Sequence, residues 1–223
     1  MKKFTNVIIL FLFTYPVGVL IGVIFWLLWL VGALEIKGWW KNFPRWQTRV
    51  VLISNHPYKG EQFLLAGLFF FQYLFQPLKH SPWIVADAKN YYNKWFCWFL
   101  RPRLIPVDRS GKNGDLKSLI TAKNILRSDG NLIIFPEGGR TSKGKAFLTS
   151  KKGKRIRVPL KEGFVSLVTE PGVILLPVWF ECNRWHDMRL IIGEPIMFTS
   201  GTPRNEVVER TERILLELAD QTD

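Results

Sequence analysis

Residues 49–63 read RVVLISNHPYKGEQF, an apolar run, a polar turn and the start of a second apolar segment. The run from Arg49 to Ile53 is typical of a buried strand, and the segment that begins at Glu61 is typical of a helix. His56 would lie where the strand ends, and Glu61 in the first helical turn, where a carboxylate suits the helix dipole. Such a turn can bring the two side chains together, and a histidine held by a carboxylate is suited to general base catalysis. The alternative is a histidine with a purely structural role.

A second stretch has the same form. The apolar residues that follow Asn131 end at Phe135, and the loop PEGGRTS occupies residues 136–142. This pattern predicts another short buried strand that runs into a glycine-containing turn. Arg140 lies in that turn, and a guanidinium can hold a phosphate through two parallel hydrogen bonds. A salt bridge that shapes the loop is the alternative for this arginine.

Together the two stretches resemble motifs of the lysophospholipid acyltransferase superfamily, which contains bacterial 1-acylglycerol-3-phosphate acyltransferases. His56 stands at the histidine of the family's His-x4-Asp motif. The family's Phe-Pro-Glu-Gly-x-Arg-Ser motif is matched by Phe135, Pro136, Glu137, Gly138, Arg140 and Thr141. Two weaker blocks, LIPVDR at 104–109 and VILLPV at 173–178, fall in the family's order. The resemblance covers about residues 45 to 200.

Two positions depart from the family pattern. Glu61 stands where most members carry aspartate, although the related lipid A acyltransferases use glutamate there. Arg103 stands where a glycine is common.

The resemblance implies an enzyme that moves a fatty acyl group from acyl-CoA or acyl-carrier protein to the free hydroxyl of a lysophospholipid. The most direct case is 1-acylglycerol-3-phosphate, which would become phosphatidic acid. The implied catalytic residues are His56 and Glu61, and the implied substrate-binding residues are Arg109, Glu137, Gly138, Arg140 and Thr141. No metal and no resident cofactor are implied. Two alternatives stay open: an O-acyltransferase for another lipid acceptor (lyso-aminolipid or lipid A-like), and a non-catalytic membrane-binding protein of the same fold.

Acyl transfer from a thioester to a hydroxyl needs a base for the hydroxyl proton and stabilisation of the developing oxyanion. His56 would take the proton from the acceptor's own hydroxyl, and Glu61 would fix the tautomer and stabilise the imidazolium. No covalent enzyme intermediate is then required. The sequence offers no candidate for the oxyanion donor.

The N-terminal segment is the clearest sign of a membrane. No charged residue occurs from Phe4 to Leu34, and these 31 residues exceed the roughly 20 that a helix needs to cross a bilayer. Pro16 and Gly18 can break the helix, so two shapes stay open: a tilted single span, or a hairpin that enters and leaves the same leaflet. The lysines and arginines that follow outnumber those before, which places the remainder on the cytoplasmic side. The sequence therefore predicts a membrane-anchoring segment at 1–40 and an acyltransferase domain at 41–223.

The rest of the chain alternates apolar runs with helical patterns, which predicts an α/β fold with a largely parallel sheet flanked by helices. We expect strands near 49–54, 82–86, 103–107, 131–135, 172–179 and 188–192. We expect helices near 61–75, 90–99, 114–128, 161–170 and 203–220.

The formal net charge is +13, and the chain holds 10 Trp and 17 Phe. Such a composition fits either nucleic acid or an anionic membrane surface, and the apolar N-terminus favours membrane lipids over nucleic acid as partners. Aromatic and basic residues alternate at 91–103, either at a membrane interface or in the core. The basic stretch 143–157 is either a solvated loop or a site for lipid, coenzyme A or an acidic carrier protein. Cys97 and Cys182 are too few to indicate a disulfide framework or a metal site.

Overall fold

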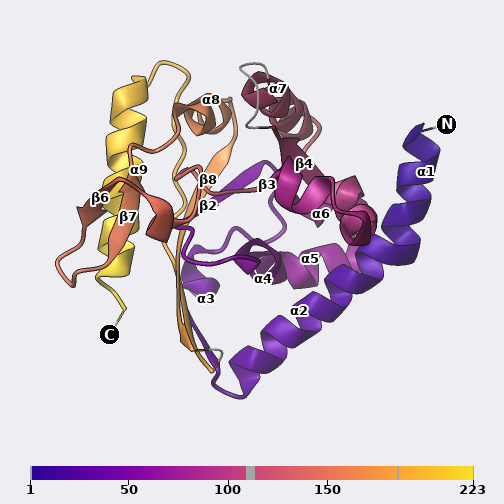
Figure 1. The fold of residues 1–223 in the computed structure, drawn as a ribbon, viewed down its shortest axis with the longest axis horizontal. Helices are drawn as coiled ribbons and strands as arrows, with labels where there is room; N and C mark the ends of the chain where they lie inside the picture. The colour runs from indigo at the N-terminus through magenta and orange to yellow at the C-terminus, as the bar shows by residue number, and fades with distance from the viewer. Residues whose placement is uncertain (1, 109–113, 185, 223) are drawn as a thin grey trace.

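The computed structural model describes residues 2–108, 114–184 and 186–222 of the chain. Its centre is a seven-stranded sheet with helices on both faces (Figure 1). In spatial order the strands are β1 (Leu34–Lys37), β9 (Asp187–Ile192), β8 (Ile174–Arg184), β2 (Val50–Ser54), β5 (Leu132–Ile134), β3 (Trp83–Asp87) and β4 (Leu104–Val107). Neighbouring strands run parallel except β8 and β9. The predicted α/β class with a largely parallel sheet is confirmed.

The strand β2 lies in the middle of the sheet, between β8 and β5, and all five of its residues are buried. This explains why it reads as an unbroken apolar run, because a central parallel strand is covered on both faces. The ends of β2 and β5 are neighbours, since Ile53 pairs with Ile134. The two polar turns that follow these strands therefore meet at one edge of the sheet.

Most predicted helices are present, with two corrections. The segment 61–75 forms α4 (Glu61–Ala66), η2 (Gly67–Phe69) and α5 (Phe70–Phe75), and the long helices α7 (Gly114–Arg127) and α9 (Arg204–Ala219) lie where expected. Residues 90–99 are not α-helical: they belong to the π-helical turn η3 (Ala88–Tyr92) and the 3₁₀ helix η4 (Trp95–Arg103). Aromatic residues are weak helix formers, and Pro102 lacks a backbone N–H.

The second correction concerns residues 161–170, which form only η6 (Glu162–Phe164) and the one-turn α8 (Val165–Val168). Gly163 and the following Pro171-Gly172 leave no room for a longer helix. Two further one-turn helices are α3 (Trp39–Asn42) and α6 (Pro77–His80).

The N-terminal segment is one helix that does not reverse direction. It comprises α1 (Lys2–Ile9), the π-helical turn η1 (Leu10–Thr14) and α2 (Tyr15–Leu30). Pro16 lies in the first turn of α2, and the π turn before it accommodates the missing N–H donor. The expected hairpin alternative is therefore wrong for these residues. Residues Asn6–Leu30 are long and apolar enough to cross a membrane, with a mean hydropathy of 2.6.

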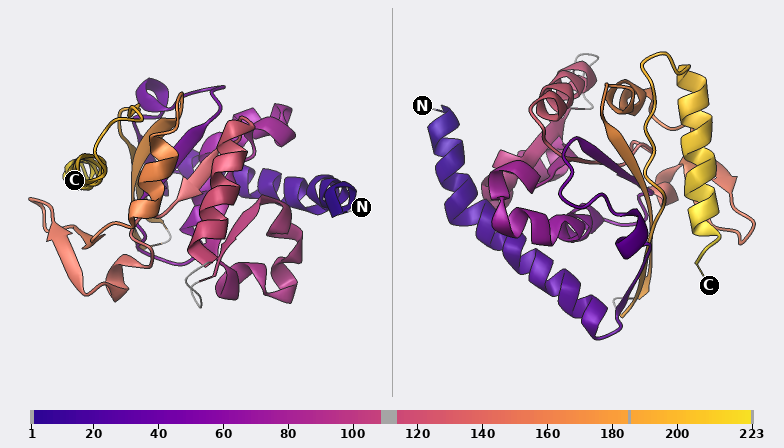
Figure 2. Two further views of the ribbon diagram at one scale, coloured as in Figure 1. Left: turned by 90° about the horizontal axis from the view of Figure 1, so that it is seen from above. Right: turned by 180° about the vertical axis from the view of Figure 1, so that it is seen from behind.

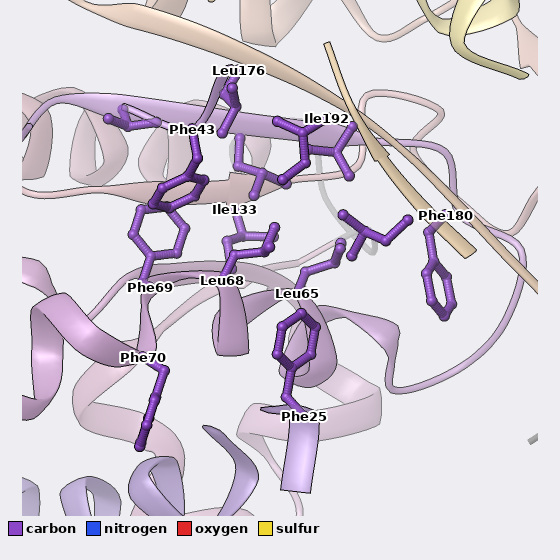
Figure 3. Packing of buried hydrophobic residues seen from close by; sticks show 14 of the residues in the cluster. Phe25, Phe43, Leu65, Leu68, Phe69, Phe70, Ile133, Leu176, Phe180 and Ile192 are labelled. Carbon is purple, nitrogen blue, oxygen red and sulfur yellow. The ribbon is translucent and has the colours of Figure 1, made fainter. Parts of the chain in front are cut away.

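This helix also packs tightly against the domain. Phe25 is completely buried beside Leu65 of α4, as Figure 3 shows. A Cβ at Gly67 would lie 2.5 Å from Cγ of Phe25, and a Cβ at Gly22 would lie 2.1 Å from Cδ2 of Phe70. Only glycine lets the helices approach this closely. Burial of one Phe side chain stabilises a fold by roughly 1.5–3 kcal/mol, so the helix forms part of the domain core.

The outward side of the same helix stays apolar. Leu12, Leu20 and Leu30 are 64%, 59% and 72% exposed. At the other end of the helix the chain enters β1, which pairs in parallel with β9 from Leu34↔Met188 to Lys37↔Ile191. The expected anchoring segment thus contributes an edge strand to the sheet.

A separate two-stranded hairpin lies within the predicted basic loop. Its strands are β6 (Ala146–Thr149) and β7 (Arg155–Val158), which pair antiparallel. Ile156 is completely buried against Leu215 of α9 and Trp179 of β8. The hairpin is therefore fixed to the face of the sheet opposite the N-terminal helix, as the views in Figure 2 show.

Candidate active site

The side chains of His56 and Glu61 meet across the turn that joins β2 to α4. Glu61 Oε1 contacts Nδ1 of His56, and Gly60 just before the helix has a left-handed backbone with φ of 94°. The His56 side chain is 19% exposed and that of Glu61 only 1%. Because an ionised carboxylate only accepts hydrogen bonds, Nδ1 carries the hydrogen and Nε2 is left to accept a proton. The juxtaposition expected from the five-residue spacing is present.

The imidazole is held on a second side by Phe135. The two rings are stacked with their centroids 4.6 Å apart and an angle of 28° between their planes. Phe135 directly follows β5, so the pairing of β2 with β5 brings the ring beside the histidine.

Asn55 fixes the start of the turn, a role that sequence reasoning missed. Its side-chain amide donates to the carbonyl of Phe180 at 2.8 Å and accepts from the N–H of Phe180 at 2.8 Å. This pair of hydrogen bonds to β8 is buried, since Asn55 is only 3% exposed. The available signal was an amide side chain next to the histidine, at the end of an otherwise apolar strand.

Glu137 is buried beneath the turn that carries His56. It has no exposed area, and its Oε1 accepts from the N–H of His56 and from the hydroxyl of Thr141, both at 2.8 Å. Its Oε2 accepts from the N–H of Arg157 on β7 at 3.0 Å. Burial raises the pKa of Glu137, and these three hydrogen bonds act in the opposite direction.

These contacts argue against direct substrate binding by two residues of the second motif. Glu137 has no surface to offer a ligand, and the hydroxyl of Thr141 is used by Glu137. The N–H of Thr141 also donates to the carbonyl of His56 at 2.8 Å. Both residues therefore hold the histidine turn and the arginine loop together.

Gly138 and Arg140 lie in the accessible part of this loop. Gly138 has a φ of +65°, and a Cβ there would lie 2.7 Å from Cγ of Lys161, so glycine is required. Arg140 is half-buried, and its guanidinium has no carboxylate partner within the described part of the chain. The loop-shaping salt bridge is thus not found there. Arg109, the other predicted phosphate ligand, lies outside the described residues.

Two further observations concern other kinds of site. Across the described ranges, no group of three or more His, Cys, Asp and Glu side chains could hold a metal ion. His80 is buried at 1% exposure with its ring 5.8 Å from that of Trp46, and burial lowers its pKa. It fits a structural role.

A small apolar cavity lies between the N-terminal helix and α4. Its volume is about 60 Å³. The lining includes Tyr15, Gly18, Phe63, Ala66, Tyr73 and Leu100. Phe63 and Ala66 belong to α4, the helix that begins at Glu61.

Comparison with known proteins identifies the family of the chain. The model of the family described as "Acyltransferase" matches residues 40–181. Among solved structures, the chain is similar to the 1-acyl-sn-glycerophosphate (LPA) acyltransferase PlsC from Thermotoga maritima. The TM-score is 0.61 at 20% sequence identity, over 94% of this chain and 81% of that one. No curated protein matches the chain.

Proposed function

We propose, since this chain belongs to the acyltransferase family, that it moves a fatty acyl group from a thioester to the free hydroxyl of a lysophospholipid. The acceptor we favour is 1-acylglycerol-3-phosphate, with phosphatidic acid as the product. The observation that carries this proposal is the partly exposed His56, held by Glu61 and hydrogen-bonded through Thr141 to the loop of Arg140, an arginine without a carboxylate partner among the described residues.

His56 acts as the general base in this proposal. With its Nδ1–H donated to Glu61, Nε2 takes the proton from the acceptor hydroxyl as the oxygen attacks the thioester carbonyl. The charge of Glu61 stabilises the imidazolium that forms. The imidazolium then returns the proton to the leaving thiolate, so the reaction ends with an ester and a free thiol.

Arg140 binds the phosphate of the acceptor. Its loop is tied to the turn of His56 by the bond from the Thr141 N–H to the His56 carbonyl, which fixes the distance between base and phosphate site. A phosphate held at a fixed distance from Nε2 presents the hydroxyl in one orientation, and such positioning is a large part of catalysis.

The outward apolar face of the N-terminal helix enters the membrane, with the domain on the cytoplasmic side. Lysophospholipids stay in the bilayer, so the enzyme must work at its surface. The cavity lined by Phe63 accommodates part of an acyl chain, because it is apolar and lies between the N-terminal helix and α4, the helix that begins at Glu61.

The deciding experiment is mass spectrometry of the lipids that the purified protein makes. Each of several lyso-acceptors, including 1-acylglycerol-3-phosphate and a lyso-aminolipid, is offered with acyl-CoA and with acyl-carrier protein. We expect phosphatidic acid as the main product. Turnover of the lyso-aminolipid alone would contradict the phosphate acceptor, and inactivity with every pair would favour a non-catalytic membrane-binding protein.

A further inference from the structure

The hairpin β6–β7 belongs to the most basic part of the chain. Residues 138–161 hold nine lysines and arginines and no acidic residue. Some of this charge is compensated by residues elsewhere: Lys154 pairs with Glu181, and the backbone amides of Lys151 and Lys152 bind Asp220. Several of the other cations have no carboxylate partner in the described part of the chain, among them Lys143, Lys145, Arg155 and Arg157.

The pairing of the hairpin places two of these cations, Arg155 and Arg157, on one face. Phe147 lies opposite Arg157, and Thr149 lies opposite Arg155, so all four side chains share a face of the ribbon. Cζ of Arg155 is 6.0 Å from the centroid of the Phe147 ring. The other face turns Ile156 into the core. We call Phe147, Arg155 and Arg157, with Lys143 and Lys145 in the lead-in, the hairpin face.

The hairpin face is close to the candidate active site yet away from the membrane helix. The N–H of Arg157 donates to Glu137, which also binds the N–H of His56. In Figures 1 and 2 the hairpin and the N-terminal helix lie on opposite sides of the sheet. When the helix enters a membrane, this face is therefore turned toward water, where a soluble partner can reach it.

We propose that the hairpin face docks a small acidic acyl carrier protein, which delivers the acyl group as its thioester. This inference rests on the proposed function and selects the donor. All four residues of β6 are exposed, so the surface stands out from the molecule, whereas small-molecule sites are concave. An exposed aromatic ring beside an arginine is a combination enriched at protein interfaces, and the positive charge of the face is complementary to acidic side chains.

The test reverses two charges that play no part in the hydrogen bonds of the active site. The double variant Lys145→Glu/Arg155→Glu is compared with Lys117→Glu, a charge reversal on an exposed residue of α7. Binding of a fluorescently labelled, purified acyl carrier protein to the full-length protein is measured by anisotropy at low and high salt. Thermal unfolding of each variant checks that the fold is kept.

We expect the double variant to weaken carrier-protein binding by about tenfold or more, since attraction becomes repulsion, and wild-type binding to weaken with salt. The KM for acyl-carrier protein should rise in parallel while the KM for acyl-CoA stays unchanged, and Lys117→Glu should resemble the wild type. An equal rise in the KM for acyl-CoA would contradict the carrier-protein proposal and would assign the hairpin face to the nucleotide part of coenzyme A. Unchanged carrier binding, or a loss confined to binding of anionic vesicles, would overturn the proposal. Because anisotropy needs no turnover, it decides the docking surface even if the wild type transfers no acyl group.

Discussion

Glu61 holds Nδ1 of His56 from inside the protein, while Nε2 of the same ring is directed to the partly exposed side. The carboxylate is 1% exposed on its side chain, and its second oxygen, Oε2, is buried without a hydrogen-bond partner in the described residues. The charge of Glu61 is therefore directed at the imidazole alone.

His56→Ala should lower the rate of acyl transfer by roughly 100- to 10,000-fold, the contribution typical of a positioned general base. Glu61→Gln should also lose most activity, because the amide cannot stabilise the imidazolium. If the residues act as one unit, the double variant is scarcely slower than either single variant. Initial rates with folded, membrane-bound protein check this, and substantial transfer by His56→Ala would refute the mechanism.

Glu61→Asp measures how much the reach of the carboxylate matters. The shorter side chain cannot contact Nδ1 from the same backbone position, so we expect kcat to fall while the KM for the acceptor is unchanged. Full activity would show that the turn adjusts and that only the charge is needed.

Arg140→Lys keeps the charge and loses the planar fork, so the KM for a phosphate-containing acceptor should rise by about tenfold. Arg204→Lys, at the exposed start of α9, is the matched control. Titration of the acceptor at saturating donor gives the KM of each variant. An unchanged KM for Arg140→Lys would place the phosphate elsewhere.

Glu137→Gln should lower kcat without changing the KM for the acceptor, because the residue positions the His56 turn and does not contact substrate. An amide offers one acceptor oxygen where the carboxylate offers two, so one donor among His56, Thr141 and Arg157 is left unpaired, at a cost of about 1–3 kcal/mol. Glu212→Gln is the control, since that carboxylate is partly buried and, like that of Glu137, accepts a hydrogen bond from a backbone N–H, the one of Leu160. A changed KM with an unchanged kcat would contradict the positioning role.

The raised pKa of Glu137 also predicts a pH dependence of stability. The folded protein keeps this proton at pH values where the unfolded chain has already lost it. The contribution of Glu137 to the free energy of unfolding is therefore present below the usual glutamate pKa, falls as the pH rises through the raised value, and stays lost above it. Denaturant unfolding of the wild type and of Glu137→Gln is measured across this pH range. The free energy of unfolding of the wild type should fall more steeply with rising pH than that of the variant.

Membrane attachment should survive washing with high salt and alkali, because burial of apolar surface is not screened by ions. Leu20→Glu/Leu27→Glu, on the exposed side of α2, should release much of the protein from the pellet without lowering its thermal stability. Gly22→Leu, by contrast, should destabilise the fold, since no space exists beside Phe70. Release of the wild type by salt alone would contradict the apolar anchor.

The sequence predicts those elements of the fold that have a clear hydrophobic pattern within their own residues. Central strands such as β2 are unbroken apolar runs. β1 (LEIK) and β7 (RIRV) alternate apolar and charged residues, as half-buried strands do, but over only four positions, so their signal is weak. His56 and Glu61 are five residues apart and can be paired by reading along the chain. The roles of Asn55 and Glu137 cannot be predicted in this way, because their partners include backbone groups of Phe180 and Arg157, and any residue except proline would supply the same N–H.

The pairing of β1 with β9 sets the order in which this protein can be completed during synthesis. Leu34 leaves the ribosome early, but its partner Met188 is made only when most of the chain exists. The helix before β1 meanwhile emerges as an apolar segment with its partners on α4 and α5 not yet synthesised, and such surface is prone to aggregation. The nascent chain therefore needs the membrane, or a chaperone, to cover that helix well before the sheet can close.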